Sequence, residues 1–98
     1  MKRPIYSPQA EADLDAITEY YSAHSPAAGV RLLDAITAKC RQLGNQPRQG
    51  NPRDNLGAGV RSVAVRQYLI FFRATATGVE VVRVLHGSRD ITPDMFEE

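Results

Sequence analysis

Two Ser-Pro pairs, Ser7-Pro8 and Ser25-Pro26, constrain the fold of this chain more than any other feature. Serine accepts hydrogen bonds at a helix N-terminus, and proline suits the first helical position, where its missing N–H has no partner to lose. Apolar residues then recur at helical spacing behind each pair, at Ala10, Leu14, Ile17 and Tyr21 and again at Leu33, Ile36, Cys40 and Leu43. The pattern predicts two amphipathic helices.

The bounds of the two helices follow from their flanking residues. We predict the first helix over residues 8–23, with acidic side chains in the early turns, where the helix dipole favours negative charge. The second helix ends near Gly44, which we expect to take a left-handed conformation at the C-terminus. Only His24 and Ser25 separate the helices, so they should form an antiparallel hairpin.

Three β-type runs follow, at 60–65, 68–74 and 79–86, after a short extended opening at Ile5-Tyr6. The connections at 66–67 and 75–78 are short enough for hairpin turns, which predicts an antiparallel meander. The middle run is apolar on both faces at 69–72, as in a central strand covered twice. We therefore predict an α+β fold, a helical hairpin packed on a small antiparallel sheet, as one domain over residues 1–98.

The glycine- and proline-rich segment 44–59 joins the second helix to the first of these runs. A connection of this length is typical of a functional or mobile loop. It is no phosphate-binding loop, because no Gly-Lys-Ser/Thr follows and no strand precedes it.

The net charge of +1 is unevenly distributed along the chain. Residues 1–40 carry four basic and five acidic side chains, whereas 41–89 carry eight arginines and only two acidic residues. The last nine residues carry four acidic side chains and no basic one. Arginine's planar fork suits phosphate, carboxylate and interface pairing. An ordinary solvated sheet surface is the simpler explanation of the charge alone, although the middle block also resembles one half of an electrostatic partnership.

Several classes of function are excluded by composition. A single cysteine, Cys40, allows no internal disulfide or cysteine-rich zinc site, and its place on the apolar helical face indicates a core residue. No apolar run is long enough to span a membrane, and no apolar stretch follows the N-terminal charges as in a secretory signal. We expect a cytoplasmic protein without metal or cofactor.

The last β-type run ends in a cluster of ionisable residues, Arg83, His86 and Arg89. In a regular strand, Arg83 would share a face with Val81 and Leu85, and His86 would lie on the other face. Two plain structural explanations stay open: Arg83 pairs with a carboxylate, and His86 caps the strand end.

A ribonuclease site is the chemical alternative for this cluster. His86 would be the general acid or base, and Arg61, Arg83 and Arg89 would stabilise charge on the phosphorane. The other histidine, His24, lies at the helix joint, which argues against a two-histidine mechanism.

The segments VRQYLIFFRA and VEVVRVLHGSRDI, behind a Ser-Pro helical hairpin, resemble ParE-type toxins of the RelE/ParE superfamily over essentially the whole chain. The resemblance implies a bacterial toxin–antitoxin module, with an antitoxin whose ribbon-helix-helix part binds DNA and whose flexible tail wraps the toxin. RelE-type members cut messenger RNA on the ribosome, using basic residues and a tyrosine or histidine near the end of the last strand. Several ParE-type members trap DNA gyrase on cleaved DNA. The last strand here ends without tyrosine, and no lysine follows Lys39, which favours the ParE type.

The expected function is therefore that of a toxin that inhibits DNA-bound gyrase by binding and has no catalytic activity. We expect a cognate ParD-like antitoxin to neutralise the toxin, and we expect no small-molecule substrate and no membrane contact. Two alternatives remain: a ribosome-dependent mRNA endonuclease, with His86, Arg83 and Arg61 as its site, and a non-toxic, antitoxin-bound member with a regulatory or plasmid-maintenance role. The expected partner-binding residues are Arg61, Arg66, Tyr68, Arg83, His86 and Arg89.

The partner would bind the sheet face away from the helices. We expect that face to be partly apolar and ringed by arginine, open to an antitoxin tail by strand addition or groove docking. The acidic end, 90–98, is either a flexible tail or folds back over the arginines through Met95 and Phe96.

Overall fold

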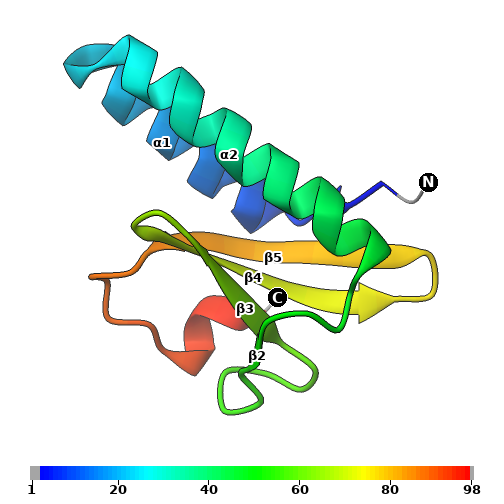
Figure 1. The fold of residues 1–98 in the computed structure, drawn as a ribbon. Coiled ribbons are helices and arrows are strands. Elements are labelled where there is room, and N and C mark those ends of the chain that lie inside the picture. Colours follow the sequence, from blue (N-terminus) through cyan, green and yellow to red (C-terminus); the bar gives the residue numbers. More distant parts are fainter. Residues whose placement is uncertain (1–2, 98) are drawn as a thin grey trace.

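The computed structural model describes residues 3–97 and shows two helices side by side across one face of a five-stranded sheet (Figure 1). The elements are β1 (Ile5–Tyr6), α1 (Pro8–His24), α2 (Pro26–Asn45), β2 (Asn51–Pro52), β3 (Arg61–Val65), β4 (Tyr68–Thr75), β5 (Gly78–His86) and the 3-10 helix η1 (Pro93–Phe96). The strand order is β1-β5-β4-β3-β2. The predicted α+β fold is confirmed. The sheet is mixed, because β1 pairs with β5 in the parallel direction while the other pairs are antiparallel.

The helical hairpin forms as predicted, with Ser25 as its single joint residue. Ser7 caps α1, since its Oγ accepts a hydrogen bond from the Ala10 N–H at 3.0 Å. Ser25 has no such side-chain bond, so proline and packing are what define the start of α2. The helices approach closely at Gly29, where a Cβ would lie 2.5 Å from the Cβ of Tyr21.

The end of α2 differs from the prediction. Gly44 is helical and buried rather than left-handed, and the helix continues through Asn45. Gln46 closes the last turn with φ −137° and ψ 66°, and its N–H donates to the carbonyl oxygens of Gln42 and Leu43 at 3.2 and 3.1 Å. These bonds satisfy carbonyls of the last turn, so no left-handed residue is needed there.

The core between the helices and the sheet contains most of the residues that the helical spacing predicts. Ile36, Cys40 and Leu43 are fully buried, and Leu33 is partly buried beside them. Leu32, absent from the predicted face, is 4 % exposed, because the buried stripe of α2 is wide enough to include it.

A bulge in β5 changes the predicted alternation of its side chains. Phe71 of β4 pairs with Arg83 and Phe72 with Val81, so Val82 is an extra residue on β5. Val84 consequently packs on the helical side of the sheet with Val81, and Leu85 packs on the far side with Val82. The predicted face shared by Val81, Arg83 and Leu85 is therefore wrong, because Val81 and Leu85 lie on opposite sides of the sheet.

The sheet face away from the helices is covered by the chain itself, which corrects the prediction of an open apolar face. The segment after α2 and the C-terminal segment cross this face (Figure 1), and they bury a second core. That core comprises Leu56, Val60, Phe71, Val82, Leu85 and Phe96. Phe96 packs edge-on against Phe71 with 5.0 Å between ring centroids, so the acidic end folds back at least as far as η1.

Candidate partner-binding site

The arginines that make residues 41–89 basic divide into two groups of four in the structure. The first group is partly buried and hydrogen-bonded within the chain, and the second is exposed. The first comprises Arg53, Arg61, Arg73 and Arg83, and the second Arg41, Arg48, Arg66 and Arg89. A guanidinium that already binds the chain has fewer donors left for a partner, so the second group holds the better candidates.

Arginines of the first group fasten the long connection after α2 to the sheet. Arg61 donates from Nε to the carbonyl oxygen of Gln49 and from Nη2 to that of Gly50, both at 3.0 Å. Arg73 donates from Nε to the Ala58 carbonyl oxygen at 3.2 Å. The connection predicted to be functional or mobile is thus held along its length by side chains of β3 and β4.

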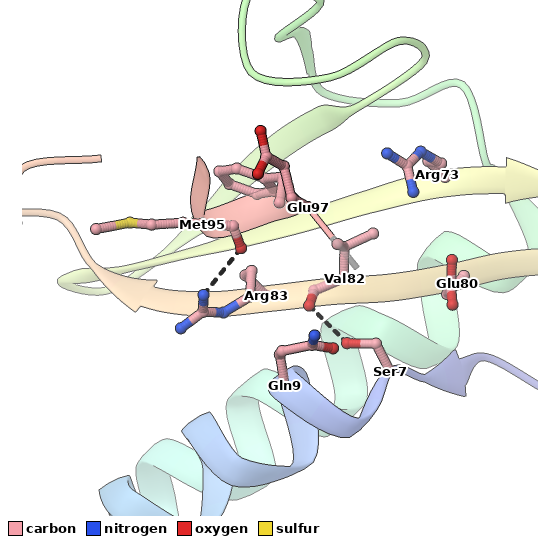
Figure 2. A pocket seen from close by; sticks show the side chains of 9 residues that line it. Ser7, Gln9, Arg73, Glu80, Val82, Arg83, Met95 and Glu97 are labelled. Atoms are coloured by element: carbon pink, nitrogen blue, oxygen red, sulfur yellow. Dashed lines mark hydrogen bonds between the residues drawn. The ribbon is translucent and has the colours of Figure 1, made fainter. Parts of the chain in front are cut away.

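Arg83 joins three layers of the molecule. Its Nε and Nη2 donate to the two carboxylate oxygens of Asp13 on α1 at 2.8 and 2.9 Å, and its Nη1 donates to the Met95 carbonyl oxygen at 2.9 Å, a contact shown in Figure 2. The hydrogen bonds to Asp13 raise the pKa of Arg83, against the opposing effect of burial. The structural explanation of Arg83, pairing with a carboxylate, is what the structure shows.

Two arginines of the exposed group lie at one end of the sheet. Arg66 occupies the turn between β3 and β4 with a φ of 55°, and Arg89 lies in the turn after β5. The two turns are joined, because the Gly87 N–H donates to the Gln67 carbonyl oxygen at 2.8 Å. Within residues 3–97, no hydrogen bond or ion pair links either guanidinium to another side chain. Both are free for an anionic group.

Tyr68 and His86 lie between these arginines as opposite residues of β4 and β5. Their rings meet edge to face with centroids 5.1 Å apart. The Ser88 N–H donates to His86 Nδ1 at 3.1 Å, so in the neutral ring the proton lies on Nε2. Burial, with smaller contributions from Tyr21 and Tyr20, raises the pKa of Tyr68, so its hydroxyl stays protonated at neutral pH.

Two hollows open on either side of Tyr68, between the helical hairpin and the end of the sheet. The larger, of about 260 Å³, is lined by Asp13, Ala16, Ile17, Tyr20, Tyr68, Val84, Leu85, His86 and Arg89. The smaller, of about 220 Å³, is lined by Tyr21, Ala28, Leu32, Arg66, Gln67 and Tyr68. Tyr20 is 56 % exposed and stacks on His24. We call Tyr20, Arg66, Tyr68, His86 and Arg89 the end surface.

Four of the six predicted partner-binding residues belong to the end surface, and two do not. Arg61 of β3 pairs with Phe72 of β4, whereas His86 of β5 pairs with Tyr68 of β4. Phe72 and Tyr68 are four positions apart on β4, which at the usual strand rise places Arg61 and His86 roughly 13 Å apart along the strands. Arg83 follows the β5 bulge and is held by Asp13. The residues proposed for a ribonuclease site, His86, Arg83 and Arg61, are therefore not gathered in one place.

Comparison with known protein families identifies the family of the chain. Residues 5–91 match the family described as the ParE toxin of the type II toxin–antitoxin system parDE. The chain belongs to the ParE toxin family. Membership of that family implies an antitoxin of the ParD type as its partner.

Individual ParE-family proteins resemble the chain over most of its length. It is 35 % identical to Toxin ParE1 of Caulobacter vibrioides, over 90 % of this chain and 92 % of that protein. It is 29 % identical to Toxin ParE1 of Mycobacterium tuberculosis, over 91 % and 93 %. The solved structure of the chromosomal ParDE toxin–antitoxin system from P. aeruginosa superposes on this chain with a TM-score of 0.73 and 24 % sequence identity. The superposition covers 88 % of this chain and 96 % of that one, and it shows that the two share a fold.

Sequence reasoning missed Tyr20 in this ParE-family toxin. Its neighbour Tyr21 fits the apolar helical face, so Tyr20 reads as an ordinary solvent-facing residue. In the sequence, Tyr20 stands out only as an aromatic residue on the polar side of a helix. The packing of α1 over the strand ends brings Tyr20 to the larger hollow.

Metal-binding clusters and membrane-spanning helices are absent from the part of the chain that the structure describes. No group of three His, Cys, Asp or Glu side chains suited to a metal ion occurs between residues 3 and 97. No helix in that part of the chain has the length and apolar character to cross a membrane.

Proposed function

We propose that this ParE-family toxin inhibits DNA gyrase by trapping its cleavage complex, and that a cognate ParD-like antitoxin neutralises it in the bacterial cytoplasm. The toxin acts by binding, with no chemistry of its own. The proposal is supported by family membership over residues 5–91 and by the resemblance to ParE-type toxins, several of which act on gyrase.

The end surface is the part of the toxin that we assign to the target. The observation that carries this assignment is the division of the arginines, because Arg66 and Arg89 remain exposed while Arg61 and Arg83 are held within the chain. Guanidinium groups suit the carboxylates of a protein surface and the phosphates of gyrase-bound DNA equally. Tyr68 and His86 supply flat rings between them.

A ribosome-dependent mRNA endonuclease is the second candidate. The observation that favours it is His86, an acid–base group, beside a protonated tyrosine and between two free arginines. Against it, Arg83 and Arg61, the cations first assigned to that reaction, are engaged with Asp13 and with the loop backbone.

The test is a plasmid cleavage assay with purified gyrase, ATP and antitoxin-free toxin. We expect linear DNA after detergent and protease treatment, and at least about tenfold less of it with the double variant Arg66→Ala/Arg89→Ala, because the toxin would lose two charged contacts to a desolvated partner. Arg41→Ala/Arg48→Ala is the matched control, since it removes two exposed arginines that line neither hollow.

The alternatives give different results in the same preparation. Absence of linear DNA, together with cleaved messenger RNA in a translation extract and loss of that cleavage in His86→Ala, would overturn the proposal in favour of the endonuclease. Folded toxin that affects neither gyrase nor messenger RNA, and leaves growth unchanged when expressed alone, would instead point to the regulatory or plasmid-maintenance role.

A further inference from the structure

The larger hollow beside Tyr68 has aromatic rings in its wall. Tyr20, Tyr68 and His86 line it, and Tyr20 remains 56 % exposed, so much of its ring is open to a ligand. Tyr20 already stacks on His24, with 4.2 Å between ring centroids and 13° between ring planes. A flat ligand ring laid on the open part of Tyr20 would extend that stack.

The polar groups that line the same hollow are mainly hydrogen-bond donors. Arg89 is exposed there, the Tyr68 hydroxyl keeps its proton at neutral pH, and the neutral His86 ring carries its proton on Nε2. Among the described residues, Asp13 is the one acidic side chain that lines the hollow, and its carboxylate is already paired with Arg83. The hollow therefore suits a ligand with a flat ring, acceptor oxygens and negative charge.

We infer that the larger hollow receives one unpaired nucleotide of the DNA strand that gyrase has cleaved, with its base stacked on Tyr20 and its phosphate paired with Arg89. Arg66 lies on the other side of Tyr68 and is available for a neighbouring phosphate. The inference rests on the proposed function, because it names the part of the DNA-bound target that the end surface contacts.

A nucleotide held in this way explains trapping without any chemistry by the toxin. A broken strand is rejoined only when its two ends lie in line at reacting distance. A base that is stacked on Tyr20 has left the base stack of the DNA, so the strand end next to it is displaced from that alignment. The toxin needs to bind only the cleaved state more tightly than the rejoined one.

An unpaired nucleotide fits the hollow better than duplex DNA does. Bases in a duplex are stacked and paired, so their faces reach a protein ring only after they leave the helix. The hollow, of about 260 Å³, lies just below the usual range of about 300–1,000 Å³ for small-molecule pockets, so it has room for one base. Proteins that bind a duplex through its backbone neutralise several phosphates, whereas the end surface offers two free arginines.

Tyr20→Trp turns the inferred stack into an optical signal. The chain has no tryptophan of its own, so the variant carries a single indole at the hollow. We expect single-stranded DNA of about 12 nucleotides to quench the indole emission, because the base stacks on it, with a dissociation constant below about 1 mM. An oligonucleotide of the same length and charge, in which every base is replaced by hydrogen, should leave the emission unchanged.

Tyr20→Leu and Tyr20→Phe separate stacking from simple apolar contact. Leucine keeps an apolar side chain but has no flat ring, whereas phenylalanine keeps the ring. We expect the affinity for labelled single-stranded DNA, measured by anisotropy, to fall at least about fivefold in Tyr20→Leu and to change less than about twofold in Tyr20→Phe.

Arg89→Gln tests the phosphate contact. It should weaken the binding of single-stranded DNA and reduce the salt dependence of that binding, because one phosphate contact is lost. Arg48→Gln is the matched control, since Arg48 is equally an exposed arginine but lines neither hollow.

Several outcomes would overturn the inference. Indole emission that single-stranded DNA leaves unchanged at about 1 mM would do so, as would equal affinity of the wild type and Tyr20→Leu. Quenching by the abasic oligonucleotide, or tighter binding of a duplex of the same sequence, would show that the surface reads only the phosphate backbone. Binding of single-stranded RNA but not DNA would assign the hollow to messenger RNA instead.

The readouts separate this inference from the proposed function. Oligonucleotide binding needs no gyrase, so it is measured whether or not the plasmid assay gives linear DNA. Tyr20→Leu toxin that traps gyrase as well as the wild type does would keep the proposed function and reject the nucleotide contact. Toxin that binds single-stranded DNA through Tyr20 but yields no linear plasmid would reject gyrase as the target and keep the nucleotide site.

Discussion

At the scale of single residues, the same side-chain type serves opposite purposes in this toxin. The Arg61 guanidinium donates to two backbone carbonyl oxygens of the loop, whereas Arg66, five positions later, lies in a turn and is exposed. The sequence alone does not distinguish the two residues, because both are arginines of the same basic segment. What separates them is whether acceptors of the chain lie within hydrogen-bonding reach, and this depends on segments distant in sequence.

Gly29→Ala tests the close approach of the two helices. Alanine normally gains up to about 1 kcal/mol over glycine in a helix, but here its Cβ would lie 2.5 Å from that of Tyr21. We expect a net loss of about 1–3 kcal/mol in the free energy of unfolding, because the helices must move apart. Urea titration measures it, with the exposed Val30→Ala on the same helix as control. A stabilised Gly29→Ala protein would show that the helices separate without cost.

At the scale of elements, polar contacts attach the start of α1 to β5. Ser7 caps the helix and donates to β5, and Asp13 accepts from Arg83 and from the backbone of Val84. The Asp13 and Arg83 side chains are 11 % and 14 % exposed, so their charges are largely removed from water. A pair in this setting is costly to break on one side.

A double-mutant cycle at Asp13 and Arg83 tests that attachment. Asp13→Asn and Arg83→Met should each lower the free energy of unfolding by about 2–4 kcal/mol, because each leaves the opposite charge without its partner. The double variant should lose less than the sum by about 1–3 kcal/mol, since both charges are gone and the asparagine oxygen can still accept from Val84. Additive losses in urea titrations would mean that the pair contributes no coupling.

At the scale of the whole molecule, the sheet is enclosed between two unlike layers. The helical hairpin covers one face, and the loop after α2 with η1 covers the other. β4 is therefore buried on both sides, with Phe72 in the helical core and Phe71 in the second core, as the apolar run 69–72 predicts. The end surface is left uncovered at the margin between the helical layer and the sheet.

Phe96→Ala tests whether the C-terminal segment is part of the folded unit. Phe96 is 6 % exposed and contacts Phe71, so its truncation should lower the free energy of unfolding by about 3 kcal/mol. The exposed neighbour Glu97→Ala should change it by less than about 0.5 kcal/mol. A small loss for Phe96→Ala in denaturant titration would show that the second core is complete without η1.

Much of the candidate site depends on features that a linear pattern cannot express. The bulge at Val82 reverses the faces of β5 beyond it, and no glycine or proline lies next to Val82 to mark its position. Tyr68 and His86 become neighbours through the register of β4 and β5, and Tyr20 joins them through the position of α1. These relations involve residues from three elements, so they are set by packing rather than by any local preference.

The sequence by itself determined the helical hairpin, the strand meander, the burial of Phe71 and Phe72 on opposite faces and, through its resemblance, the family. Each of these depends on local signals: capping residues, the period of apolar side chains and the length of turns. Only the tertiary structure decided which arginines are free, what covers the far face of the sheet and that β1 joins β5 in parallel. The physical reason is that hydrogen-bond partners and apolar contacts form between residues that are far apart in the chain and meet only when it is folded.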